Sequence, residues 1–249
     1  MRTLLVVVGL LTCPQLALAQ SGINLFWNHC YTDGGAHHQT FACNTNIGFD
    51  ALQMSVVVPA DLPHFVGASI SMRVTAASGQ VPAWWQVWGG QCRANAVTVS
   101  FDPNQLPESG GCPSIWGGVT PLQAFQIQPG QDGTNEAFVL AALAELPTGG
   151  EAAVVADGTE LLVGQVVIRH TKTVGAGACE GCSAGACFML QEVFLQQPYP
   201  LPNYRVTRPR VTNWAFYNSS SGLRPENTYI PCEVPALNRT WGAIKSMYR

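Results

Sequence analysis

Apolar and polar side chains alternate along several segments of the chain. From Val66 to Thr75, apolar residues alternate strictly with small or polar ones, and a period of two indicates a strand with one buried face. Residues 159–171 carry apolar groups on both faces until Arg169, as expected for a central strand. We expect further strands at 23–27, 52–58, 97–101, 188–196 and around Phe125 and Ile127.

Turn clusters rich in Gly and Pro separate these segments, at 32–35, 109–111, 129–133 and 147–150. Many short strands joined by such turns predict a mainly β fold, namely an antiparallel β-sandwich of the Ig-like or jelly-roll-like kind. Residues 135–146 are ambiguous, because an Ala-rich helical composition coincides with alternation of Phe138 and Leu140. We favour a strand there, because the neighbouring segments are strands.

The N-terminal residues predict export. Arg2 precedes an apolar run from Leu4 to Leu11, and Ala17-Leu18-Ala19 fits the small-x-small pattern that signal peptidase cleaves after. We therefore expect a signal peptide over 1–19 and a secreted or cell-surface protein that begins at Gln20. The apolar run is too short to span a membrane, and the sequence indicates no transmembrane segment. A lipoprotein signal ending at Cys13 is the alternative, although the residues before that cysteine fit it poorly.

Charge divides the remaining chain in two. Residues 20–197 contain 4 basic and 13 acidic residues, a net charge of −9, whereas residues 198–249 contain 7 basic and 2 acidic residues, a net charge of +5. We predict a β-sandwich domain over 20–197 and a Pro-containing basic C-terminal extension over 198–249. Only 11% of all residues are charged and the whole chain is acidic, so the composition does not indicate a nucleic-acid partner.

Cysteine usage agrees with export. Removal of residues 1–19 leaves eight cysteines, and an even number in an oxidising compartment predicts disulfides: Cys30, Cys43, Cys92, Cys112, Cys179, Cys182, Cys187 and Cys232. Their spacing favours local Cys30–Cys43 and Cys92–Cys112 bridges, one bridge within the 179–187 triplet and one from that triplet to Cys232. Spacing does not fix the connectivity, since eight cysteines allow roughly a hundred pairings. Zinc binding or redox chemistry at the C-x2-C pair is the alternative interpretation.

Two clusters are candidate binding sites. His29, His37 and His38 lie within ten residues of one another, with Asp33 between them, and such ligands could hold a transition metal. The spacing matches no defined metal motif, and a polar loop tip is the simpler interpretation.

The second cluster consists of tryptophans. Trp84, Trp85 and Trp88 crowd one strand-like stretch near Trp116. Core packing is the favoured interpretation, and a platform that stacks on a glycan is the alternative. If the stretch is a strand, Trp84 and Trp85 point to opposite faces, so at least one ring of that pair should be partly exposed.

Three segments of the chain resemble a group of uncharacterised exported bacterial proteins. They are the start Gly22-Ile-Asn-Leu-Phe-Trp-Asn-His-Cys, the C-x2-C-x4-C turn at 179–187 and the C-terminal Trp-Gly-x-x-Lys-x-x-Tyr-Arg ending. The resemblance implies export, the early cysteine pair and a β fold, and it brings no activity.

The ending also has a pattern of its own. Trp241, Ile244 and Tyr248 are spaced as one face of a short C-terminal helix, and Lys245 suits its C-terminal end. This helix either packs on its own domain or docks to a partner.

These observations favour a non-enzymatic extracellular or cell-surface module, structural or adhesive, with no cofactor. The basic tail of one copy could bind the acidic body of the next, which would give self-association. A carbohydrate-binding module using the tryptophans is the first alternative. A secreted hydrolase using scattered groups such as Asp33 and His37 is the second, because the sequence contains neither G-x-S-x-G nor H-E-x-x-H.

Overall fold

Strands are the dominant secondary structure of the described residues, as the alternating pattern predicts. The computed structural model describes residues 20–76, 80–102, 104, 112–130 and 137–218. The helices among these residues are two single 3-10 turns, η1 (Tyr31–Asp33) and η2 (Ala83–Trp85). None of the described helices is long and apolar enough to cross a membrane. The predicted signal peptide and C-terminal helix lie outside the described residues.

Four antiparallel strands form the smaller of the two main sheets. Its order is β1-β3-β10-β6, with β1 at Gly22–Trp27, β3 at Phe49–Val57, β10 at Leu161–Arg169 and β6 at Val97–Ser100. Both faces of β3 are buried after its first residue. Apolar side chains such as Leu52 and Met54 belong to the core, whereas Gln53 donates to Gln165 of β10 and Ser55 donates to Glu160.

The larger sheet has the order β2-β13-β11-β5-β8-β7, and β12 also pairs with β11. Its strands are β2 (His38–Gln39), β5 (Gly67–Ala76), β7 (Leu122–Pro129), β8 (Ala137–Glu145), β11 (Ala186–Gln196), β12 (Tyr204–Val206) and β13 (Trp214–Tyr217). All its pairings are antiparallel except β13 with β2. A separate pair consists of β4 (Leu62–Phe65) and β9 (Ala152–Val154).

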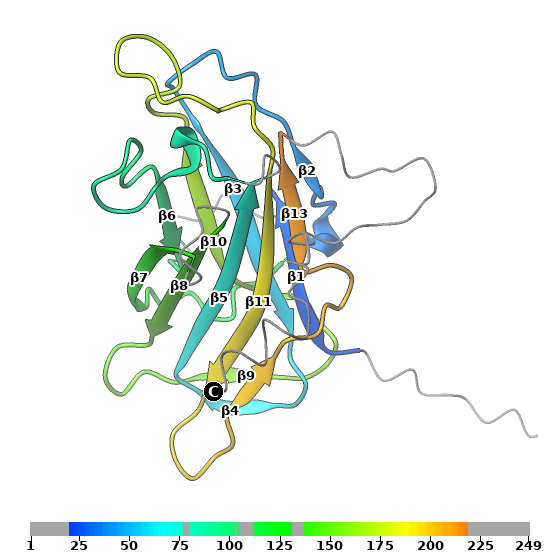
Figure 1. Cartoon of the computed structure of the whole chain (residues 1–249). Helices are drawn as coiled ribbons and strands as arrows, with labels where there is room; N and C mark the ends of the chain where they lie inside the picture. The colour runs from blue at the N-terminus through cyan, green and yellow to red at the C-terminus, as the bar shows by residue number, and fades with distance from the viewer. Residues whose placement is uncertain (1–19, 77–79, 103, 105–111, 131–136, 219–249) are drawn as a thin grey trace, which may run out of the picture.

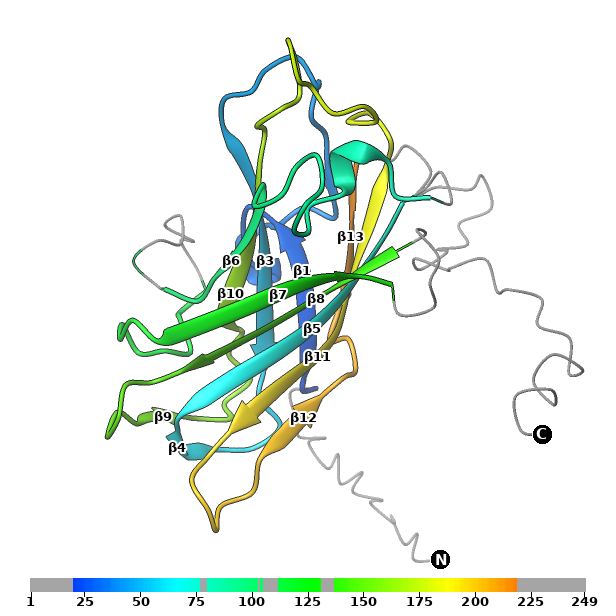
Figure 2. The same cartoon turned by 60° about the vertical axis from the view of Figure 1, so that its left-hand side comes forward.

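Side chains from both main sheets form one hydrophobic core. In Figures 1 and 2, the larger sheet with β5 and β11 lies across the smaller sheet with β1, β3 and β10. Trp27 of β1 meets Phe188 of β11 edge to face, with ring centroids 5.6 Å apart. Aromatic pairs of this geometry add to the stabilisation that burial of apolar area provides.

Two sequence predictions about this fold have clear outcomes. Residues 137–145 form strand β8, so the strand interpretation of the ambiguous segment is confirmed. The boundary placed after residue 197 is wrong, because β12 and β13 both pair with β11 of the larger sheet. The proline-rich composition after residue 197 concealed these strands, which are only 3 and 4 residues long.

Candidate functional site: a disulfide-pinned loop end

Several loops gather at the end of the molecule that Figure 1 draws at the top. They include the chain between β2 and β3, the chain around η2 and the chain between β10 and β11. The Cys43–Cys182 disulfide joins the first of these loops to the third, and Cys92–Cys179 joins the second to the third. Functional side chains are often carried by loops that a rigid scaffold positions, so we take this loop end as the candidate site.

The predicted local disulfide pairing is wrong. Cys30 is bonded to Cys112, 82 residues away, and the loop-end disulfides span 139 and 87 residues. Cys30 follows β1 and packs with Cys112 and Leu162, whereas Cys43 lies in the loop end after β2. Cys187 is also disulfide-bonded, and the prediction for Cys232 lies outside the described residues.

A buried acidic centre lies below the loops. The Asp50 carboxylate, at the start of β3, is 2.8 Å from His170 Nε2 and accepts a 2.6 Å hydrogen bond from the Tyr217 hydroxyl. The side chain of Gln39 donates to its other oxygen. Burial is the main cause that raises the pKa of Tyr217 far above its usual value, and the hydrogen bond to Asp50 and the negative charge of Asp50 raise it further. Tyr217 is therefore a permanent donor to this carboxylate.

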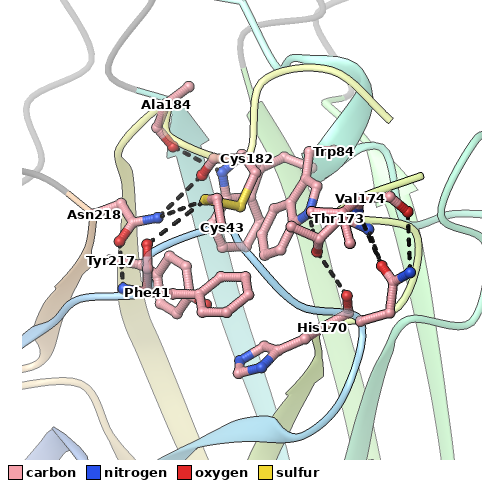
Figure 3. The surroundings of a disulfide bond; sticks show 12 residues. Phe41, Cys43, Trp84, His170, Thr173, Val174, Cys182, Ala184, Tyr217 and Asn218 are labelled. Atoms are coloured by element: carbon pink, nitrogen blue, oxygen red, sulfur yellow. Dashed lines mark hydrogen bonds between the residues drawn. A yellow bond between two sulfur atoms is a disulfide. The ribbon is translucent and has the colours of Figure 1, made fainter. Parts of the chain in front are cut away.

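His170 links this acidic centre to the loops. Its Nδ1 lies 3.1 Å from the Ile47 carbonyl oxygen, so both ring nitrogens face oxygen acceptors. Phe41 stacks on the ring at a centroid distance of 3.8 Å, beside Cys43–Cys182 in Figure 3. An Asp–His pair can orient a base toward a nucleophile, but here the second nitrogen faces a backbone carbonyl, so the pair fastens a loop.

Arg93 carries the second buried charge. It is 1% exposed, its guanidinium carbon lies 3.5 Å from the centre of the Trp84 ring, and it donates to the carbonyls of Thr171, Trp84 and Arg169. Burial lowers the pKa of Arg93 to about 10, so it stays charged at neutral pH. The cation thus holds η2 against the chain that leaves β10.

The predicted tryptophan platform is not formed. Trp84, Trp85 and Trp116 are at most 1% exposed, and Trp88 packs against the core near Phe138. The expectation that Trp84 or Trp85 is partly exposed is wrong, because residues 83–85 form a 3-10 turn rather than a strand. Each buried ring nitrogen has an acceptor: Thr173 Oγ1 for Trp84, and the carbonyls of Ala184 and Val163 for Trp85 and Trp116.

The predicted metal ligands do not converge either. His29 lies 3.1 Å from Asp33, whereas His37 packs between the Phe26 and Trp214 rings and His38 stacks on Phe216. Burial is the main cause that lowers the pKa of His37, and a backbone hydrogen bond with Trp214 opposes it. Among the described residues, three potential ligands approach one another at Cys30, Cys112 and Glu160. All four predicted ligands are among the described residues and they form no such group, and Cys30 and Cys112 are joined in a disulfide.

Glu160 is an important residue that the sequence analysis missed. It is 2% exposed, and its carboxylate accepts hydrogen bonds from Asn24 Nδ2 at 2.7 Å, from the Thr32 N–H and hydroxyl at 2.9 Å each, and from Ser55. Burial would raise the pKa of Glu160, but these bonds outweigh burial and hold the pKa below its usual value. The carboxylate fastens the η1 loop onto β1 and β3. One sequence signal was present, since Glu160 is an acid that directly precedes the apolar strand β10.

The predicted docking residues Trp241, Ile244, Lys245 and Tyr248 lie outside the described residues. Comparison of the chain with family models, with curated proteins and with solved structures found no match. The site must therefore be interpreted from its own geometry.

Proposed function

We propose that this protein is an exported, non-enzymatic extracellular or cell-surface module, structural or adhesive, built on an Ig-like or jelly-roll-like β-sandwich that self-associates. One observation carries the proposal: strand β7 is an uncharged, exposed sheet edge. Three long-range disulfides and the sequence of residues 1–19 support export. Structural hydrogen bonds occupy the polar side-chain atoms of Asp50, His170 and Glu160, which supports a role other than catalysis.

Strand β7 ends the larger sheet and pairs only with β8 among the described strands. Seven of its eight residues are exposed and the eighth, Ile127, is half-buried, so both of its faces are open. Its sequence, LQAFQIQP, contains no charged residue. Native proteins normally protect such an edge with charges, a bulge or a covering segment, because unpaired backbone groups there template the addition of another strand.

The inner face of β7 extends beyond the core. Phe125 lies opposite Ala142 of β8, which is 5% exposed and belongs to the core, yet Phe125 itself is 43% exposed. The smaller sheet has only four strands and ends at β6, so the last strand of the larger sheet has no full cover. On the opposite face of the sheet, Leu122 and Leu143 add exposed apolar surface at 68% and 48%.

A second copy of the chain suits this edge. Antiparallel pairing about a two-fold axis at Phe125 sets Phe125 opposite Phe125 of the second copy, and Ala124 opposite Gln126 of that copy. Aromatic residues pair well across antiparallel strands, and the uncharged edge brings no like charges together. Such an interface is isologous and closes as a dimer.

Sedimentation velocity over a wide range of protein concentrations tests this proposal. We expect a monomer–dimer equilibrium for the natural sequence. Phe125→Lys should raise the dissociation constant of the dimer at least about tenfold, because like charges then face each other across the edge. Val155→Lys is the matched control, since Val155 is 62% exposed and follows β9. A monomer at every concentration, or an unchanged dimer in Phe125→Lys, would refute β7 pairing. Association through the basic tail stays a separate prediction, because that tail lies outside the described residues.

A further inference from the structure

The loop end carries apolar side chains that point away from the core. We call Ile47, Phe49, Val174, Arg169 and Lys172 the loop tip. Ile47 is 83% exposed, Phe49 55% and Val174 37%. Ile47 and Val174 belong to the two loops that project together beyond the sheets in Figures 1 and 2. Phe49 begins β3 and lies opposite Arg169 of β10.

Hydrogen bonds hold the loop tip in one conformation. The side chain of Asn46 donates to the Val174 carbonyl at 3.0 Å and accepts from the Thr173 and Val174 N–H groups at 2.7 and 3.0 Å. The Ile47 N–H donates to Thr45 Oγ1, and the His170 N–H donates to the Gly48 carbonyl. The two disulfides of the loop end anchor the same loops. Exposure of these apolar groups is therefore built into the folded structure.

Positive charge is concentrated at the loop tip. Residues 20–197 contain only four basic residues, Arg73, Arg93, Arg169 and Lys172. Arg169 and Lys172 are exposed here, and Arg93 is buried beneath. Residues 44–49 and 169–178 contain no acidic residue. Asp50 follows directly but is buried and hydrogen-bonded, and the next acid after the second segment is the exposed Glu180.

We propose that the loop tip docks this protein onto an anionic phospholipid surface. The aliphatic and aromatic side chains would enter the boundary between headgroups and acyl chains, and Arg169 and Lys172 would lie at the phosphate level. Membrane association of this kind combines buried apolar area with attraction of basic residues to anionic lipid. A projecting tip fits a flat bilayer better than a ligand that needs a cavity. The proposal does not depend on pairing at β7.

Vesicle co-sedimentation tests the proposal directly. The purified protein is mixed with vesicles of phosphatidylglycerol and phosphatidylcholine, or of phosphatidylcholine alone. We expect binding to the anionic vesicles that weakens as salt rises, and at least about tenfold weaker binding to the neutral ones. Absence of binding to either kind of vesicle, or equal binding to both, would overturn the proposal.

Two variants separate the apolar and the electrostatic contributions. Ile47→Asp should weaken binding at least about tenfold, while Val155→Asp, which places the same charge at an exposed valine after β9, should bind like the natural sequence. The double change Arg169→Gln and Lys172→Gln should remove the preference for anionic vesicles. Circular dichroism of each variant checks that it folds. Unaltered binding by Ile47→Asp would show that the loop tip is not the contact surface.

Discussion

At the scale of the residue, Glu160 shows most clearly how one buried group fastens a loop. Its carboxylate accepts hydrogen bonds from Asn24, Thr32 and Ser55. In Glu160→Gln, the amide N–H would face at least one of these donors, and two donors cannot form a hydrogen bond. We expect a loss of about 2–3 kcal/mol in the free energy of unfolding at pH 7, measured by urea denaturation. Because the folded pKa of Glu160 is depressed, its stabilisation is complete above the unfolded pKa near 4.5 and is lost as pH falls through the folded value.

The difference between Glu160→Gln and the natural sequence should therefore shrink below pH 4.5. Glu151→Gln is the control, since Glu151 pairs with His64 where both side chains are about half exposed. An exposed pair contributes roughly 0–1 kcal/mol, so this variant should change little at either pH. A Glu160→Gln protein as stable as the natural one at pH 7 would mean that the carboxylate does not fasten the η1 loop.

At the scale of the element, periodicity predicted the long strands and the short β6, and it missed the other short strands. The alternation from Val66 to Thr75 has a clear period, and β5 occupies 67–76. Strands such as β2 and β12 have 2 and 3 residues, too few for a period to emerge. Their positions depend on tertiary contacts, for example the parallel pairing of β13 with β2. The prediction of a strand at the tryptophan stretch was wrong for a related reason. The buried contacts of Trp84 and Trp85, rather than a local period, set the conformation of η2.

The disulfides show the same dependence on tertiary structure. Spacing along the chain favoured local bridges, yet each described pair joins segments that only the fold brings together, such as the loop after β1 and residue 112. We expect mass spectrometry of a non-reduced chymotryptic digest to yield a Cys30–Cys112 peptide pair, and the peptides of Cys43 and Cys92 both linked to the one peptide that contains Cys179 and Cys182. Recovery of a Cys30–Cys43 or Cys92–Cys112 peptide from folded protein would contradict this connectivity. The same digest of reduced and alkylated protein is the control.

At the scale of the whole molecule, the two proposed surfaces constrain each other. Antiparallel pairing of β7 about an axis normal to the sheet reverses every direction within the sheet plane. The loop tips lie at one end of each copy (Figures 1 and 2), so the two tips of a dimer would point in opposite directions. A dimer could then hold two bilayers together, whereas it could not place both tips on one flat bilayer.

This geometry makes a prediction that neither surface makes alone. The natural sequence should cluster anionic vesicles, seen as increased light scattering, because each dimer presents a loop tip at both ends. Phe125→Lys should bind the same vesicles without clustering them, and Ile47→Asp should do neither. Clustering by Phe125→Lys equal to that of the natural sequence would show that another contact joins the copies. Binding without clustering by a proven dimer would place both tips on the same side, which rules out pairing through the two-fold axis at Phe125.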